Sequence, residues 1–403
     1  MPDVLPRLRF NLDFMPSPDP EKPGLYIRDP YGYSGATLLV PPPLVQALEC
    51  FDGVQSAIDL RAELVRITGE IQVGEIEKHL HDALDEAGFL ENDRYRALKA
   101  EREASFAAEP LREASFAGSA YPEDTLNLSN LLLQRVGKAE GSAETIAIAA
   151  PHASPEGAWN TYRAAYRSLP LNGDADHTFL ILGTSHYGAP DRFGLTRKSF
   201  VTPFGTTRTD VKLVDELACA APNAIRMEDY CHAVEHSIEF QVIMLQHLYG
   251  PQVKILPVLC GPFVKSIYDG TAPEANPDVA HFFDALGNIA VREGRRLSWI
   301  LGVDMAHMGR RYGDPLRAKA NLGEMLAIEG RDRARIEQII AGDREAYWSL
   351  VQEGQDDLKW CGSAPFYTFL KAMPEAKGEL LGYQQWQIDP DSVVSFGALR
   401  FTR

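Results

Sequence analysis

The chain has 403 residues, of which 45% are apolar and 24% charged, as is ordinary for a globular protein with a sizeable core. Its formal net charge of −16 disfavours nucleic acid and anionic membrane surfaces as partners. The five cysteines are scattered without a Cys-x-x-Cys pair, which is typical of reduced thiols in a cytoplasmic protein. No stretch approaches 18 apolar residues and the first residues lack an apolar segment, so we expect neither a membrane span nor a signal peptide.

Residues 1–95 predict a small separate domain. Two short strands at 25–28 and 36–40 precede three short helices, of which the second has Ser56 as its expected N-cap. This order resembles a winged-helix domain. Between residues 42 and 92, however, eleven Asp and Glu face three Lys and Arg, whereas a DNA-binding domain needs a basic surface. We therefore expect a domain that binds a peptide or a protein and no DNA.

Residues 96–112 are charged and rich in alanine, which predicts a solvent-exposed linker helix. From residue 113 to 403 the pattern changes to apolar strands that alternate with helical segments. That alternation is typical of an α/β domain with a parallel sheet flanked by helices.

Three apolar segments of this second domain end in polar, chemically reactive residues. Strand 145–150 runs into His152, strand 178–183 into His186, and strand 297–303 into Asp304 and then His307. Ligands bind outside the carboxyl ends of the strands in an open parallel sheet. We expect the three strands to lie side by side, with those of His152 and His186 as direct neighbours about 4.8 Å apart.

The residue types at these strand ends fit a metal site. A mononuclear iron site needs two histidines and one carboxylate on one face, which His152, His186 and Asp304 can supply. His307 is a substitute ligand or a base. The alternative is that each histidine is a structural residue, hydrogen-bonded at the edge of the sheet.

His236 and Glu239 lie one turn apart on a predicted helix. Their spacing suits a general acid/base pair in which Glu239 orients His236; the alternative is a hydrogen bond on the helix surface. The signatures of common serine hydrolases, P-loop NTPases, zinc proteases and dinucleotide-binding enzymes are absent from the sequence.

Short motifs of the second domain follow one another in the order and spacing of the Memo family, which this domain resembles. They are Phe116-Ala-Gly-Ser-Ala-Tyr-Pro122, Ala150-Pro-His-Ala153, Leu182-Gly-Thr-Ser-His186, Thr202-Pro-Phe-Gly205, Glu235-His-Ser-Ile-Glu239, Leu256-Pro-Val-Leu-Cys-Gly261, Asp304-Met-Ala-His307, Cys361-Gly362 and Ser395-Phe-Gly-Ala398. The resemblance implies the LigB-like fold of class III extradiol dioxygenases for residues 113–403. Bacterial members are similar to protein B of the AmmeMemoRadiSam system, which implies a radical-SAM protein and an AMMECR-type protein as partners.

By the same resemblance, His152 and His186 are metal ligands and His236 is an active-site histidine. Animal members of the family have a cysteine where this chain has Ala306, and alanine cannot bind metal. The third ligand is therefore expected from Asp304, from His307 or from Glu239; the alternative is that there is no third ligand. The expected metal is divalent: Fe(II), with copper or zinc as alternatives.

The first domain also resembles the small PqqD-type domains that bind peptides for radical-SAM enzymes. Phe51-Asp-Gly53 and Asp85-Glu-Ala-Gly-Phe-Leu90 are among the residues that carry this resemblance.

The sequence therefore leaves two hypotheses for the function of the whole chain. The first is a metal-dependent redox enzyme of dioxygenase ancestry, acting on a small-molecule or peptide substrate. The second is a non-catalytic component of the radical-SAM system that binds a substrate or a peptide.

Overall fold

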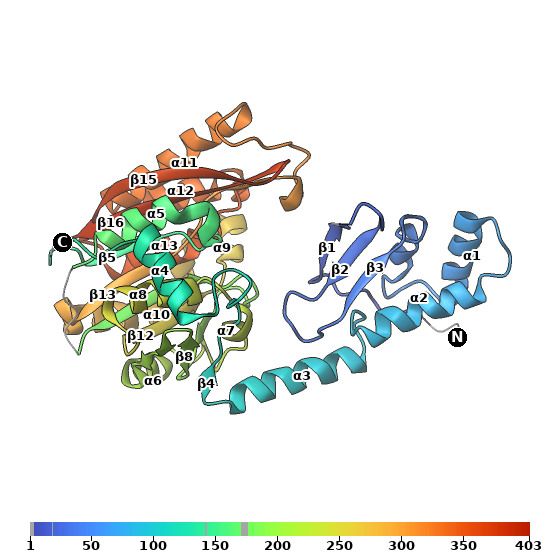
Figure 1. The fold of residues 1–403 in the computed structure, drawn as a ribbon, viewed down its shortest axis with the longest axis horizontal. Helices are drawn as coiled ribbons and strands as arrows, with labels where there is room; N and C mark the ends of the chain where they lie inside the picture. Colours follow the sequence, from blue (N-terminus) through green and yellow to red (C-terminus); the bar gives the residue numbers. More distant parts are fainter. Residues whose placement is uncertain (1–3, 18, 142, 171–175) are drawn as a thin grey trace. The chain divides into compact units, whose positions relative to one another are not determined.

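The computed structural model describes residues 4–17, 19–141, 143–170 and 176–403, and it divides the chain into two compact units (Figure 1). The first unit is Met1–Ala108 and the second is Glu109–Arg403. The predicted linker helix is α3 (Asp93–Ala108), which belongs to the first unit. The division between the units thus falls within the segment 96–112.

The first unit contains an antiparallel sheet of order β1-β2-β3, covered by helices. Ser56 is the N-cap residue of α1 as expected, and in the capping box its backbone N–H donates to Asp59 Oδ2 at 2.7 Å. The first predicted helix is instead a pair of 3-10 turns. The elements are β1 (Asp13–Pro16), β2 (Leu25–Arg28), β3 (Thr37–Val40), η1 (Pro42–Leu44), η2 (Gln46–Cys50), α1 (Ala57–Thr68) and α2 (Gly74–Glu86).

The second unit is built on a ten-stranded sheet, which confirms the α/β class predicted from the sequence. Its order is β11-β7-β12-β6-β13-β5-β16-β14, with β10 beside β12 and β15 beside β16. The central strands β12, β6, β13 and β5 are parallel. The strands are β5 (Ala147–Ala150), β6 (Thr178–Thr184), β7 (Phe193–Leu195), β10 (Arg208–Thr209), β11 (Ile225–Met227), β12 (Lys254–Cys260), β13 (Leu297–Gly302), β14 (His307–Gly309), β15 (Lys377–Asp389) and β16 (Ser392–Thr402).

One expectation about strand order is wrong. The strands that precede His152 and His186, β5 and β6, are not neighbours, because β13 pairs with both of them. Parallel strands are joined by long crossovers, so a strand from late in the chain can enter between two earlier ones without leaving a sign in local spacing.

Both faces of this sheet are buried, as parallel sheets require. Alternate residues of β6 enter two different cores: Leu180 and Leu182 pack with one set of helices, Phe179 and Ile181 with the other. Helices α6, α10, α11, α12 and α13 contribute to the first core, and α4, α5 and α8 to the second. The helices are α4 (Thr125–Arg135), α5 (Pro155–Arg167), α6 (Val211–Ala220), α7 (Cys231–Val234), α8 (Glu239–Tyr249), α9 (Val264–Asp269), α10 (Pro277–Glu293), α11 (Glu324–Ala341), α12 (Arg344–Gln352) and α13 (Ser363–Ala372).

The second unit also contains a small sheet of order β4-β8-β9. Its strands are β4 (Leu111–Arg112), β8 (Ser199–Thr202) and β9 (Gly205–Thr206), and the short turns are η3 (Pro273–Ala275), η4 (Gly294–Arg296), η5 (Arg310–Tyr312) and η6 (Glu353–Gln355). Within the described part of the chain, none of the helices has the length and apolar character to cross a membrane.

Candidate metal centre

The carboxyl ends of three parallel strands lie level with one another. Gly302, the last residue of β13, is paired with Ala150 of β5 on one side and with Gly183 of β6 on the other. His152 follows the end of β5 by two residues, and His186 follows the end of β6 by two residues. The side chains after these strands therefore meet at one edge of the sheet.

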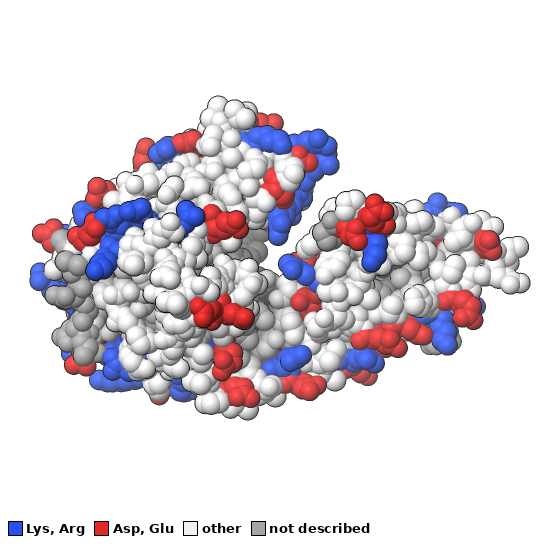
Figure 2. Space-filling model, in the orientation of Figure 1, with Lys and Arg blue, Asp and Glu red and all other residues white. Residues whose placement is uncertain are grey.

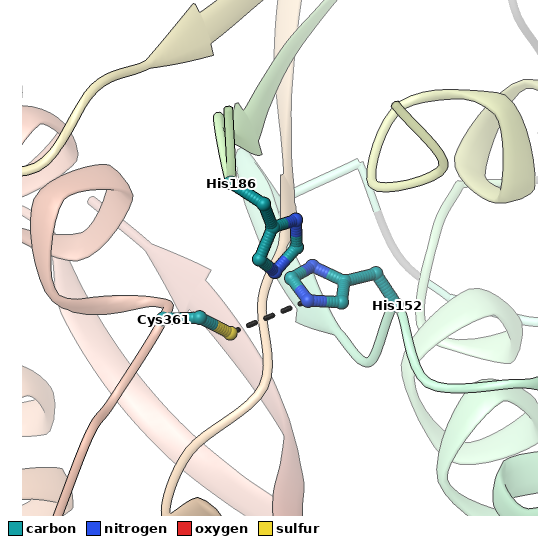
Figure 3. Close-up of side chains that lie close together, drawn as sticks. All are labelled: His152, His186 and Cys361. Atoms are coloured by element: carbon teal, nitrogen blue, oxygen red, sulfur yellow. Dashed lines mark hydrogen bonds between the residues drawn. The ribbon is translucent and has the colours of Figure 1, made fainter. Parts of the chain in front are cut away.

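Three potential ligand side chains point toward one another at this edge, from three different segments (Figure 3). Cys361 Sγ lies 3.3 Å from His152 Nε2. The ligand atoms of His152, His186 and Cys361 all lie within 4.8 Å of one another. The side chain of His152 is 2% exposed and that of His186 is 27% exposed, so the cluster is buried on one side and accessible on the other.

His152 is held so that one ring nitrogen faces the cluster. Its Nδ1 lies 2.9 Å from the carbonyl oxygen of Gly302. Because a carbonyl only accepts hydrogen bonds, Nδ1 carries a proton, and Nε2 is the nitrogen that can bind a metal once its own proton has left. The backbone N–H of His152 donates to Asp304 Oδ1 at 3.0 Å, and Asp304 Oδ2 lies 3.6 Å from Nε2. Asp304, the predicted third ligand, thus lies against His152 and has one oxygen engaged by the backbone.

Cys361, to which the sequence analysis gave no role, completes the cluster with His152 and His186. Cys361 follows no strand but lies in the loop before α13, and for that reason it received no role. Cys361 can come close to the strand ends because the next residue is Gly362. A Cβ at Gly362 would lie 2.8 Å from the Asp304 carbonyl oxygen. The signal that was available is the Cys361-Gly362 pair within the motif series.

His186 forms a second group with Glu235 and His236. The Nδ1 atoms of His186 and His236 lie 3.0 and 3.2 Å from Glu235 Oε1. The two rings are stacked, with centroids 5.1 Å apart and planes 6° apart. The His236 ring centroid is also 5.1 Å from that of His152, so His236 lies over the cluster.

His236 is not on a helix, contrary to the sequence prediction. Helix α7 ends at Val234, the backbone is extended at Glu235, and α8 begins only at Glu239. The carboxylate of Glu239 faces other groups: it accepts from the Arg112 guanidinium, from the Tyr121 hydroxyl, and from backbone N–H groups at 3.0 and 3.1 Å. Glu235 therefore makes the contact with His236 that was expected of Glu239.

His307 lies at the start of β14 and borders the same cluster through its ring. Its Nδ1 is 2.9 Å from the Met305 carbonyl oxygen and 3.1 Å from that of Lys359. The ring packs edge-on against Tyr312, with centroids 5.0 Å apart. Two carbonyl acceptors at Nδ1 leave Nε2 of His307 as the nitrogen that can contact another group.

Two glycines let the turn that carries Glu235 and His236 approach the strand ends. A Cβ at Gly183 would lie 2.6 Å from Ser237 Oγ, and one at Gly302 would lie 2.3 Å from the Ser237 carbonyl oxygen. Any side chain at these positions would push the turn away from the sheet. Gly183, the second-last residue of β6, and Gly302, the last residue of β13, are therefore needed to bring His236 to the cluster.

The charges of the cluster are strongly coupled. Burial opposes ionisation of Cys361, but the neighbouring His152 and His307 outweigh it and hold the pKa of the thiol well below its ordinary value. Burial lowers the pKa of His152, but Cys361 and Asp304 raise it to about 9. Without metal, a thiolate is thus paired with an imidazolium, and a metal cation can take the place of the proton.

In the second group, the pKa values of His186 and His236 are shifted in opposite directions. Burial lowers the pKa of His186, but the Glu235 carboxylate outweighs it and raises that pKa well above its ordinary value. Burial lowers the pKa of His236 to about 3, against the opposing effect of Glu235. His236 is therefore a neutral imidazole near pH 7, with its Nε2 free to accept a hydrogen bond.

An α/β sheet that gathers two imidazoles and one thiolate at its carboxyl edge defines a protein with a candidate mononuclear metal centre. Residues 112–400 match the Memo-like protein family, and the chain belongs to that family. The resemblance identified from the motif series is thereby confirmed.

The relatives of this chain include proteins of different lengths. It is 29% identical over 401 residues to a MEMO1 family protein of Aquifex aeolicus, covering 98% of this chain and 99% of that protein. It is 32% identical over 310 residues to the MEMO1 family protein TK1477 of Thermococcus kodakarensis, covering 73% of this chain and 100% of that protein. The Aquifex protein thus matches both units, whereas the Thermococcus protein is matched over its whole length by about three quarters of this chain.

Proposed function

We propose that this Memo-family protein binds one first-row transition metal ion through His152, His186 and Cys361 and uses it in redox chemistry. The observation that carries the proposal is the convergence of three donors from distant parts of the chain. His152 and Cys361 are 209 residues apart in sequence, yet their donor atoms are 3.3 Å apart. Chance hydrogen bonding at a sheet edge does not explain a half-buried thiol that meets two imidazoles.

The donor atoms fit a metal ion in chemistry and in spacing. Metal–nitrogen bonds of about 2.0–2.1 Å and metal–sulfur bonds of about 2.3 Å place the N and S ligands of a tetrahedral site roughly 3.6 Å apart. The observed 3.3 Å between His152 Nε2 and Cys361 Sγ needs an adjustment of only tenths of an ångström. Two imidazoles and a thiolate suit copper and zinc as well as Fe(II). Because zinc has no redox chemistry, the proposed role requires iron or copper.

The residues around the cluster offer hydrogen-bonding groups to a substrate. When bound, the metal would supply electron transfer or Lewis-acid chemistry. His236, neutral and with a free Nε2, can accept a hydrogen bond from a substrate, and Nε2 of His307 can accept one from another side. Phe116 and Phe240 pack on the His236 ring, each with centroids 5.5 Å apart, and limit the access of water there.

The finer features of the proposal come from the family. We propose a LigB-like sheet of dioxygenase ancestry for the second unit and a winged-helix, PqqD-like domain for the first. We propose that the protein acts in the cytoplasm with a radical-SAM protein and an AMMECR-type protein. A parallel sheet with its site outside the carboxyl ends of the strands supports the first of these proposals.

Metal content after anaerobic loading tests the proposed function. The wild-type protein is expected to bind one equivalent of Fe(II) or Cu(I), and His152→Ala and His186→Ala are expected to bind none. His247→Ala is the matched control, because His247 is half-buried on α8 and contacts the Gly137 carbonyl oxygen at 2.7 Å. Absence of bound metal in the wild type, or equal binding by all four proteins, would sink the proposal.

A second candidate function, binding of an extended peptide, is supported by an apolar groove on the first unit. The groove has a volume of about 460 Å³ and runs between strand β3 and helix α2. Strand β3 pairs with β2 and is the edge of its sheet, so its outer N–H and C=O groups offer a template for an added strand. The lining residues are Leu38, Leu39, Val40, Pro41, Leu44, Glu75, Ile76, His79, Leu80 and Ala83.

Calorimetric titration of the full-length protein with a purified radical-SAM protein and with a purified AMMECR-type protein tests this second function. One of the two is expected to bind, and Ile76→Glu is expected to abolish binding by placing a charge in the groove. Ile71→Glu is the control, since Ile71 is 88% exposed and lies outside the groove. Equal binding by both variants, or no binding to the wild type, contradicts the peptide-binding function.

A further inference from the structure

Glu235 connects His186 and His236, the two stacked histidines at the candidate metal centre. Glu235 lies between α7 and α8, where its backbone is extended, and its side chain is 1% exposed. Its Oε1 is 3.0 Å from His186 Nδ1 and 3.2 Å from His236 Nδ1. The backbone N–H groups of His186 and His236 also donate to it, both at 2.9 Å, and that of Ser237 donates at 3.3 Å.

These contacts distinguish a hydrogen-bond acceptor from a metal ligand. The atoms of His186, Glu235 and His236 lie within 4.8 Å of one another, a spacing that a second metal ion would also use. A carboxylate ligand, however, presents its oxygens to the cation, whereas both oxygens of Glu235 receive backbone N–H groups. N–H dipoles stabilise an anion and repel a cation. The arrangement therefore favours Glu235 as an acceptor for both rings.

We propose that Glu235 is a positioning residue that sets the orientation of His186 and His236 together, so that Nε2 of each ring is directed away from it and toward the centre. The inference rests on the metal site proposed above. An acceptor at Nδ1 fixes the tautomer of an imidazole and raises its basicity at the other nitrogen. One carboxylate shared by two rings also accounts for their stacking, with planes 6° apart.

The main chain around Glu235 is itself fixed. The Arg112 guanidinium donates to the Glu235 carbonyl oxygen at 2.9 Å and to that of His232 at 2.7 Å. Ser237 Oγ donates to the Thr184 carbonyl oxygen at 2.8 Å. The carboxylate is thus preorganised, and a change at its end group is expected to act on the two rings more than on the fold.

Zinc affinity of the full-length protein, measured by competition with a chromophoric chelator, tests the role of Glu235. Glu235→Gln is expected to bind one Zn(II), as the wild type does, with affinity lowered by roughly 10–100-fold. Glu239→Gln is the matched control, a buried carboxylate in the same segment whose partners are Arg112 and Tyr121 and not a ligand histidine. Its zinc affinity is expected to stay within about threefold of wild type.

The tautomer of His236, measured by nitrogen NMR, is a readout that a purely structural role would not move. In the wild type, with or without zinc, His236 is expected to carry its proton on Nδ1. Glu235→Gln is expected to give a mixture of tautomers, and Glu235→Asp, which keeps the charge but is too short to reach both rings, an intermediate result.

Three outcomes overturn the inference. One is an Nε2-protonated His236 in the wild type, a measurement that needs no variant to fold. Another is an equal loss of zinc affinity in Glu235→Gln and Glu239→Gln. The third is binding of two zinc ions by the wild type and of one by Glu235→Gln, which would make Glu235 a ligand. A wild type that binds no zinc contradicts the metal site itself, and the tautomer of His236 still tests Glu235.

Discussion

Replacement of Cys361 by serine separates the site seen in the structure from the site predicted from the sequence. Serine keeps the volume of the side chain but is a poor metal ligand near neutral pH. If the ligands are His152, His186 and Cys361, the substitution removes one of three protein donors. If Asp304 is the third ligand, the substitution leaves the donor set intact.

The expected loss is large because the thiolate is a direct ligand. Zinc binding by structural sites with four protein ligands is worth about 10–16 kcal/mol, or roughly 2.5–4 kcal/mol for each ligand. Removal of one ligand should then weaken binding by about 60- to 700-fold, since 1.4 kcal/mol corresponds to a factor of ten. The loss should exceed the roughly 10–100-fold expected of a residue that only orients a ligand.

The assay is an anaerobic competition titration of Cys361→Ser and of Asp304→Asn, with thermal unfolding to show that both variants are folded. Asp304 engages His152 through its backbone N–H at 3.0 Å, so Asp304→Asn is expected to cost less than Cys361→Ser. A Cys361→Ser variant that binds as tightly as the wild type, together with loss of binding in Asp304→Asn, would refute the assignment of the thiol.

Further predictions concern pH, stability and DNA. Metal affinity should rise from pH 6 to pH 9 in competition titrations, because the pKa of His152 is raised to about 9 and its proton must leave when the metal binds; a pH-independent affinity contradicts this. Burial lowers the pKa of His232 to about 4, so the stability linked to this residue is complete above about pH 6.5 and is lost as the pH falls through 4, by on the order of 3 kcal/mol. Urea unfolding of the wild type should therefore depend more steeply on pH in that window than unfolding of His232→Asn. Glu239→Ala should lower the free energy of unfolding by about 3–5 kcal/mol, because it leaves the buried Arg112 without its carboxylate; a loss below about 1 kcal/mol speaks against it. In low salt, gel-shift experiments should show no micromolar binding of duplex DNA, because the face of the first unit in Figure 2 intersperses Lys and Arg with Asp and Glu.

The local sequence pattern was enough to predict that His152 and His186 meet at one edge of the sheet. The apolar runs before His152 and His186 are buried strands, and their ends meet as an α/β sheet requires. The order of the strands was beyond local pattern, because β13 enters between β5 and β6 after more than a hundred further residues. Cys361 was missed for the same reason: a residue in a loop has no periodicity that shows which strand end it approaches.

The segment around His236 shows how a helix boundary changes a functional assignment. A helix that included His236 would place Glu239 beside it by one-turn spacing. Because α8 begins at Glu239, His236 belongs to the preceding turn and its ring meets Glu235 instead. Gly183 and Gly302 permit that turn to approach the sheet, a requirement of three-dimensional packing that the sequence pattern alone does not reveal.

X-ray absorption at the metal edge of the loaded protein tests the central claim most directly, because it counts sulfur ligands at the metal itself. A centre formed by His152, His186 and Cys361 predicts one sulfur scatterer at about 2.3 Å together with imidazole nitrogens at about 2.0–2.1 Å. The sulfur contribution should vanish in Cys361→Ser. A loaded wild-type protein whose metal has only nitrogen and oxygen neighbours would contradict the account.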